Sequence, residues 1–105
     1  MRYIVDIDGT ICTQSNPDYE NAIPDKDRIL KLNSLYDEGH TIIYLTARGM
    51  GRSNGDATAA INMLYDFTKK QLDKWGVKYH KLVLGKPAGD MYIDDKGINA
   101  EIFFK

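Results

Sequence analysis

The stretch VDIDGT (residues 5–10) holds two carboxylates, Asp6 and Asp8, directly after the apolar run RYIV (residues 2–5). Like charges that lie close together repel one another, and burial at the end of a strand raises that cost, so a positive partner is needed. If the strand continues through them, its two-residue alternation sends both carboxylates to the same side. Gly9 then lets the chain turn away at once. The pair is the first candidate for chemistry.

Further polar groups follow three other apolar runs of the chain. They are Thr46 after residues 41–45, Lys86 after residues 79–84, and Asp94 with Asp95 after residues 91–93. In an open parallel sheet, ligands bind beyond the carboxyl ends of the strands, so these groups and the first acidic pair converge at one edge. A divalent cation and Lys86 would balance the carboxylates there. Hard oxygen ligands, without histidine or cysteine at these strand ends, favour Mg²⁺ over zinc.

A Mg²⁺ ion beside a lysine and a strand-end hydroxyl suits a phosphoryl group, because the metal and the ammonium both neutralise its oxygens. A carboxylate can itself be the nucleophile and form an aspartyl-phosphate, which divides one difficult step into two. A second carboxylic acid two residues on can protonate the leaving alkoxide and then activate water. These residue types predict phosphoryl transfer.

The order of elements indicates how these groups are positioned. We expect strands at residues 2–5, 41–45, 79–84 and 91–93, one helix from the cap Asp25 to about Asp37, and another over residues 57–74. Residues 98–104 fit either a last strand or a terminal helical turn. Strand and helix alternate, which predicts an α/β fold with a parallel sheet and helices on both faces.

The 105 residues are expected to form a single domain, residues 1–105. Residues 11–24 contain two prolines and several turn formers, which predicts an irregular segment that can serve as a flap over the site. The Gly-rich residues 48–56 would form the other wall. Within them, Arg48 and Arg52 fit either a contact to a substrate carboxylate, hydroxyl or second phosphate, or a role in solubility.

The composition argues against several classes of function. The formal net charge of −1 argues against a general nucleic-acid or anionic-membrane binder. The apolar runs are far shorter than the roughly 20 residues that span a bilayer, and the acidic pair comes so early that we expect no signal peptide. The single cysteine, Cys12, excludes an internal disulfide and fits a reducing, cytoplasmic location.

Together these motifs resemble the haloacid dehalogenase (HAD) superfamily. The resemblance rests on DIDGT (residues 6–10), Thr46 after YL, Lys86 in GKP and the aspartates of YIDD (residues 92–95), in the right order over nearly the whole chain. It implies a HAD-like, Rossmann-like three-layer sandwich with a central parallel sheet. It also implies a phosphatase, because members with other chemistry usually lack an acid at the position of Asp8.

The resemblance implies a role for each matching residue. Asp6 would be the nucleophile and an Mg²⁺ ligand, and Asp8 would be the general acid/base and would bind Mg²⁺ through its backbone carbonyl. The other implied roles are phosphoryl binding by Thr46 and the amide of Ala47, pairing of Lys86 with Asp6 and the phosphate, and Mg²⁺ binding by Asp94 and, directly or through water, by Asp95.

The spacing of the motifs indicates the capless branch of the superfamily. Only 35 residues separate Thr10 from Thr46, and 39 separate Thr46 from Lys86, so neither gap holds a cap domain. Without a cap, the flap or a neighbouring subunit of a homo-oligomer could close the site. A narrower resemblance, carried by DIDGTIC, YENAIP, TARG and YIDDK, is to small phosphatases of capsule or polysaccharide biosynthesis.

We therefore expect a Mg²⁺-dependent phosphatase that hydrolyses a small phosphorylated metabolite, such as a sugar or amino-alcohol phosphate. A phosphorylated macromolecule is an alternative substrate, because a capless site is accessible. A non-catalytic phosphate-binding or signalling module is a further alternative. Receiver domains also combine acids, threonine and lysine, but in an order different from Thr46, Lys86 and then Asp94-Asp95. The presence of an acid at position 8 argues against a non-catalytic binding role.

Overall fold

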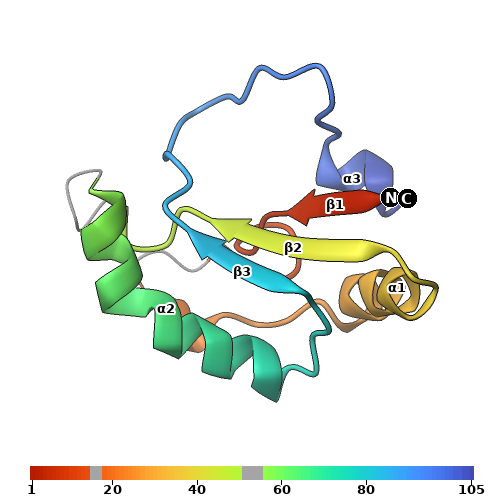
Figure 1. Ribbon diagram of the computed structural model, residues 1–105, viewed down its shortest axis with the longest axis horizontal. Helices are drawn as coiled ribbons and strands as arrows, with labels where there is room; N and C mark the ends of the chain where they lie inside the picture. The colour runs from red at the N-terminus through yellow and green to blue at the C-terminus, as the bar shows by residue number, and fades with distance from the viewer. Residues whose placement is uncertain (15–17, 51–55) are drawn as a thin grey trace.

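The computed structural model of the protein describes residues 1–14, 18–50 and 56–105. Along the chain its elements are β1 (Arg2–Val5), the 3₁₀ helix η1 (Tyr19–Asn21), α1 (Lys26–Asp37), β2 (Thr41–Thr46), α2 (Ala57–Lys74), β3 (Lys81–Leu84) and α3 (Ala100–Phe103). The described strands form a parallel sheet in the order β1-β2-β3 (Figure 1). The predicted α/β fold with a parallel sheet is confirmed.

The register brings the carboxyl ends of the strands to one edge of the sheet. Val5 pairs with Tyr44, and Thr46 pairs with Leu84. Because Asp6 follows β1 and Lys86 follows β3 after a single glycine, both residues start from that edge. This glycine, Gly85, has a φ of 99°, a conformation that side chains with a Cβ rarely adopt, so the chain can turn sharply after β3.

The main core lies on one face of the sheet. Leu32 of α1, Ile42 of β2 and Leu72 of α2 are all fully buried in one core cluster. Ile4 points to the opposite face, where it is 54% exposed. Both long helices cover the same face, so the prediction of helices on both faces is wrong for the described residues. Two right-handed crossovers that advance in one direction across a sheet place both helices on one side.

Both long helices begin at an aspartate cap. Asp25 accepts a hydrogen bond from the backbone N–H of Arg28 at the start of α1, and Asp56 caps α2 in the same way. Such caps stabilise a helix by about 1 kcal/mol each. The predicted bounds, to Asp37 for the first helix and residues 57–74 for the second, are confirmed. In the described part of the chain, no helix is long and apolar enough to cross a membrane.

Residues 85–99 form an arch that leaves β3 and reaches α3 beside β1 (Figure 1). Residues 91–93 are not a strand within this arch, and Met91 and Ile93 are 78% and 93% exposed. The predicted fourth strand is therefore wrong. A run of three residues can make few ladder hydrogen bonds, and these do not offset the entropy lost when the segment is ordered on the edge of β1.

The carboxyl-terminal residues form a helical turn, which is the second of the two predicted alternatives. Asn99 caps α3 by accepting a hydrogen bond from the backbone N–H of Glu101. The ring of Phe103 packs against Tyr3 of β1, with centroids 5.8 Å apart, and the guanidinium of Arg28 lies 4.8 Å from the ring centroid of Phe104. α3 is thus fixed to β1 and α1, at the amino end of the sheet's edge strand.

Candidate active site

Asp6 and Lys86 form the open part of the candidate site. The ammonium Nζ of Lys86 lies 3.7 Å from Oδ2 of Asp6, and the Asp6 side chain is 36% exposed. The backbone N–H of Lys86 donates to the carbonyl of Thr46 at 3.1 Å, which ties the start of the arch to the end of β2. The Nζ atom also lies 4.3 Å from the ring centroid of Tyr92. The strand ends thus converge as the sequence predicts.

The surroundings of Asp6 make its carboxyl group more basic than usual. Burial raises the pKa of Asp6 above its ordinary value, although the positive charge of Lys86 acts in the opposite direction. The neighbouring Asp8 adds to the increase. A carboxylate that is less stabilised by its surroundings and still reachable from solvent is suited to attack an electrophile.

The positive partner of Asp8 is Arg48. Nε of Arg48 donates to Oδ2 of Asp8 at 2.9 Å, and Nη2 donates to Oδ1 at 3.0 Å. The Arg48 side chain is 0% exposed and that of Asp8 is 13% exposed. The pair is therefore a bidentate, largely buried salt bridge, the strongest geometry for these two groups. Sequence reasoning considered Arg48 for substrate contact or solubility, but the described structure exposes none of its side chain to a substrate.

Arg48 is itself held by residues that the sequence did not single out for this role. Its Nη1 donates to Oε1 of Gln71 at 2.6 Å and to Oγ1 of Thr68 at 3.4 Å, both on α2. Its guanidinium carbon lies 4.9 Å from the ring centroid of Tyr19. In the sequence Thr68 and Gln71 lie in the predicted helix over residues 57–74, where Thr68 falls at helical spacing from Leu64 and Leu72, and Gln71 gave no signal.

Thr46 and Ala47 lie at the end of β2, next to this network. The side chain of Thr46 is buried, and its Oγ1 accepts a hydrogen bond from the backbone N–H of Arg48 at 3.1 Å. The carbonyl of Ala47 accepts from Met50 at 3.0 Å and closes a turn. The structure brings both residues to the predicted edge, and their phosphoryl contact stays a prediction. Arg52 lies outside the described residues.

The described part of the flap, residues 11–14 and 18–24, is packed onto the body of the protein. The phenol oxygen of Tyr19 accepts from the backbone N–H of Gly49 at 3.2 Å, and its carbonyl accepts from Nε2 of Gln71 at 2.8 Å. Cys12 is buried beside Asp8, and burial raises the pKa of its thiol to about 12, which disfavours a nucleophilic thiolate. The flap is thus anchored next to the buried salt bridge.

Asp94 and Asp95 are not brought to the site in this arrangement. Both are exposed on the arch, and Oδ1 of Asp94 accepts from the backbone N–H of Lys96 at 3.0 Å. The arch carries them away from the carboxyl edge because residues 91–93 do not pair with β1 (Figure 1). The four predicted metal residues are therefore split between two parts of the molecule.

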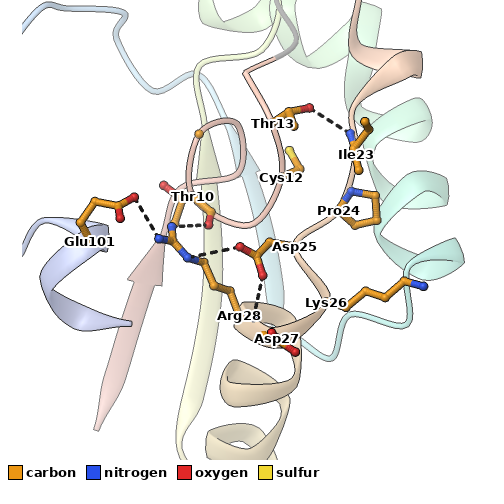
Figure 2. A pocket seen from close by; sticks show the side chains of 11 residues that line it. Thr10, Cys12, Thr13, Ile23, Pro24, Asp25, Lys26, Asp27, Arg28 and Glu101 are labelled. Carbon is orange, nitrogen blue, oxygen red and sulfur yellow. Dashed lines mark hydrogen bonds and ion pairs between the residues drawn. The ribbon is translucent and has the colours of Figure 1, made fainter. Parts of the chain in front are cut away.

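A hollow of about 500 Å³ is lined by Gly9 and Thr10, by the flap, by the start of α1 and by Glu101 of α3. Figure 2 shows Arg28 at its centre, donating to the carbonyl of Thr10 and paired with Glu101 and Asp25. Asp6 and Lys86 do not line this hollow. It borders the candidate site without containing the groups that would do chemistry.

Within the described residues, the fold and the site define an α/β protein with a parallel three-stranded sheet and an acidic edge. A crystal structure of an MCSG target protein from Vibrio cholerae superimposes on it with a TM-score of 0.88 and 33% sequence identity, over 98% of this chain and 86% of that one. The chain belongs to the family of that Vibrio cholerae protein.

A second structural neighbour shows the fold alone. It is a chain of the Pnkp1/Rnl/Hen1 complex, with a TM-score of 0.59 and 19% identity. The match covers 99% of this chain and 34% of that chain, so the whole of this fold corresponds to one part of a longer protein. No family model and no curated protein matches the sequence.

Proposed function

We propose that the protein is a capless phosphatase of the HAD superfamily, a single Rossmann-like domain that hydrolyses a small phosphate monoester through an aspartyl-phosphate. One observation carries this: two carboxylates two residues apart have different surroundings. Asp6 is partly open and faces Lys86, whereas Asp8 is held in a buried salt bridge. Acids with such contrasting environments are typical of a nucleophile paired with a general acid/base.

In the first step, an oxygen of the Asp6 carboxylate attacks the phosphorus of the ester and forms a new phosphorus–oxygen bond. The bond from phosphorus to the ester oxygen breaks, and that oxygen takes a proton from Asp8, which enters this step in its carboxylic-acid form while still accepting the hydrogen bonds of Arg48. Lys86 offsets the negative charge of the phosphoryl oxygens from its place beside Asp6. The products are a free alcohol and the aspartyl-phosphate.

In the second step, the Asp8 carboxylate removes a proton from a water molecule, and the water oxygen attacks the phosphorus. The bond between phosphorus and the Asp6 oxygen breaks. Inorganic phosphate leaves and the Asp6 carboxylate is regenerated, while Asp8 keeps the proton for the next cycle. The same acid thus serves both half-reactions.

Mg²⁺ is the proposed cofactor, and Asp6, Asp8, Asp94 and Asp95 are its proposed ligands. Their oxygens suit this hard cation. However, in residues 1–14, 18–50 and 56–105 no group of three or more His, Cys, Asp or Glu side chains could hold a metal ion. The arrangement described here therefore does not fit a complete Mg²⁺ site. Completing it requires the arch to approach β1.

The proposed substrate class follows from the narrower resemblance to capsule and polysaccharide phosphatases. A sugar phosphate or an amino-alcohol phosphate is small, and Asp6 is open enough at 36% exposure to meet such a group without a cap domain. We also propose that a neighbouring subunit of a homo-oligomer forms one wall of the site.

The proposed function is tested by phosphate release from a panel of sugar, amino-alcohol, amino-acid and nucleotide monophosphates and one phosphopeptide. Each substrate is tested with Mg²⁺ and with EDTA. We expect release that requires Mg²⁺ and is fastest with a sugar or amino-alcohol phosphate. Release from the phosphopeptide alone would favour a macromolecular substrate, and no release from any substrate would contradict a phosphatase.

A further inference from the structure

We propose that Arg48 is a positioning residue that fixes the Asp8 carboxylate for the two proton transfers, and that α2 and the flap hold Arg48 in turn. The inference rests on the proposed phosphatase function and assigns Arg48 a role different from substrate binding. It comes from the geometry of four side chains, those of Asp8, Tyr19, Arg48 and Gln71.

The salt bridge fixes both the position and the plane of the Asp8 carboxylate. The two hydrogen bonds of 2.9 and 3.0 Å join two nitrogens of one planar guanidinium to the two oxygens of one carboxylate. A single contact would let the carboxylate rotate about its terminal torsion, whereas two parallel contacts do not. A general acid/base must present one oxygen to the leaving group and then to water, so this restriction matters for both steps.

Burial separates this role from substrate binding. The Arg48 side chain is 0% exposed, so no part of it can touch a phosphate ester that enters from solvent. Four of its hydrogen-bonding directions are already used, two by Asp8, one by Gln71 and one by Thr68. Its positive charge therefore acts on the reaction through Asp8, while the more exposed Lys86 is the cation next to Asp6.

Gln71 connects the salt bridge to the flap. Its Oε1 accepts from Nη1 of Arg48 at 2.6 Å, and its Nε2 donates to the carbonyl of Tyr19 at 2.8 Å. The Tyr19 ring lies against the guanidinium, with its centroid 4.9 Å from the guanidinium carbon. One α2 side chain thus fixes both the cation and the flap residue that covers it, so a change at any of the three loosens Asp8.

The test measures steady-state kinetics with p-nitrophenyl phosphate, whose leaving group needs little protonation, and with glycerol phosphate, whose leaving group needs it. Arg48→Lys keeps the charge and loses the bidentate contact. We expect kcat for glycerol phosphate to fall roughly 10²-fold with KM changed by less than about twofold, and a smaller fall for p-nitrophenyl phosphate. Arg28→Lys, a matched change in an arginine paired with Glu101, should leave both constants unchanged.

A double-mutant cycle separates positioning from a general structural role. In the Asp8→Asn background, Arg48→Lys should cause no further loss of kcat, because its effect passes through Asp8. An equal loss in both backgrounds, or a higher KM with an unchanged kcat, would overturn the inference. Urea unfolding of each variant shows the folded fraction, so that kcat is compared per folded molecule.

Gln71→Leu is the second variant, for the case that Arg48→Lys does not fold. It removes the acceptor of Arg48 and should lower kcat roughly 10-fold for glycerol phosphate with KM unchanged. An unchanged kcat would overturn the inference. Wild-type protein without phosphatase activity would overturn the proposed function and the inference together, whereas active wild type with additive variants would overturn the inference alone.

Discussion

The two aspartate pairs of the chain lie in opposite surroundings. The first pair, Asp6 and Asp8, follows a paired strand and is held by Lys86 and by the buried Arg48. The second pair, residues 94–95, is exposed on the arch, where the apolar residues before it are exposed as well. The difference follows from packing, because a strand inside a ladder fixes the residues after it and a lone extended segment does not.

In the described structure Asp6 and Asp8 are already held in place by their partners, whereas Asp94 and Asp95 would have to move to reach them. The first pair supplies the proposed nucleophile and the proposed acid and lies beside two cations, and the flap is anchored next to it through Tyr19. The second pair has no comparable support within the described residues. If Mg²⁺ needs both pairs, its binding includes the free energy of ordering the arch.

Replacing the nucleophile should give the largest effect. Asp6→Asn should reduce phosphate release below detection, because an amide cannot attack phosphorus in place of the carboxylate. The measurement is steady-state release with saturating Mg²⁺. Asp90→Asn, the same change at an exposed arch residue, is the matched control and should retain full activity. Near-normal turnover of the Asp6→Asn protein would rule out the aspartyl-phosphate mechanism.

Replacing the acid/base should give a smaller loss of activity together with a loss of stability. Asp8→Asn should lower kcat roughly 10²–10⁴-fold. It also leaves Arg48 buried without its carboxylate, which should lower the free energy of unfolding by about 3 kcal/mol. Urea unfolding and kinetics on the same preparation measure both effects. An unfolding free energy equal to that of the wild type would show that the salt bridge is not as buried as described.

The two isoleucines beside the aspartate pairs test the contrast in packing directly. Ile7 is 0% exposed and Ile93 is 93% exposed. In EDTA, Ile7→Ala should lower the free energy of unfolding by about 2–5 kcal/mol, whereas Ile93→Ala should change it by less than about 0.5 kcal/mol. A large loss in the Ile93→Ala protein would mean that the arch is packed against the sheet in solution.

Metal dependence tests whether the arch joins the site. Asp94→Asn should raise the Mg²⁺ concentration that gives half-maximal activity roughly 10–100-fold, with kcat at saturating Mg²⁺ much less affected. Asp90→Asn is again the control. An unchanged Mg²⁺ requirement would place the metal ligands elsewhere and remove the need for the arch to move.

Local sequence patterns were sufficient for the three described strands, for both long helices and for the meeting of Asp6 with Lys86. Asp25 as a cap marked the start of the first helix, and the polar residues after β1 and β3 indicated that Asp6 and Lys86 would meet. These features depend on neighbouring residues or on the shared edge of parallel strands. They can therefore be inferred without knowledge of the packing.

Two features could not be inferred because they depend on contacts between distant parts of the chain. An arginine after a strand looks the same in the sequence whether it faces solvent or a buried carboxylate forty residues earlier, as Arg48 does. The apolar run at residues 91–93 resembles a strand, but whether it pairs is decided by the distant edge of β1 and by the entropy of the arch. The positions of Asp94 and Asp95 depend on the same distant contacts, because both residues directly follow this run.

The most direct test of the central claim is a search for the aspartyl-phosphate itself. Asp8→Asn protein is incubated with p-nitrophenyl phosphate and Mg²⁺, quenched in acid and digested for mass spectrometry. Because this substrate leaves without protonation while the second step lacks its base, the intermediate should accumulate. The account predicts a phosphoryl group on the peptide that contains Asp6. Nitrophenol released in amounts well above the enzyme concentration, with that peptide unmodified, would contradict it.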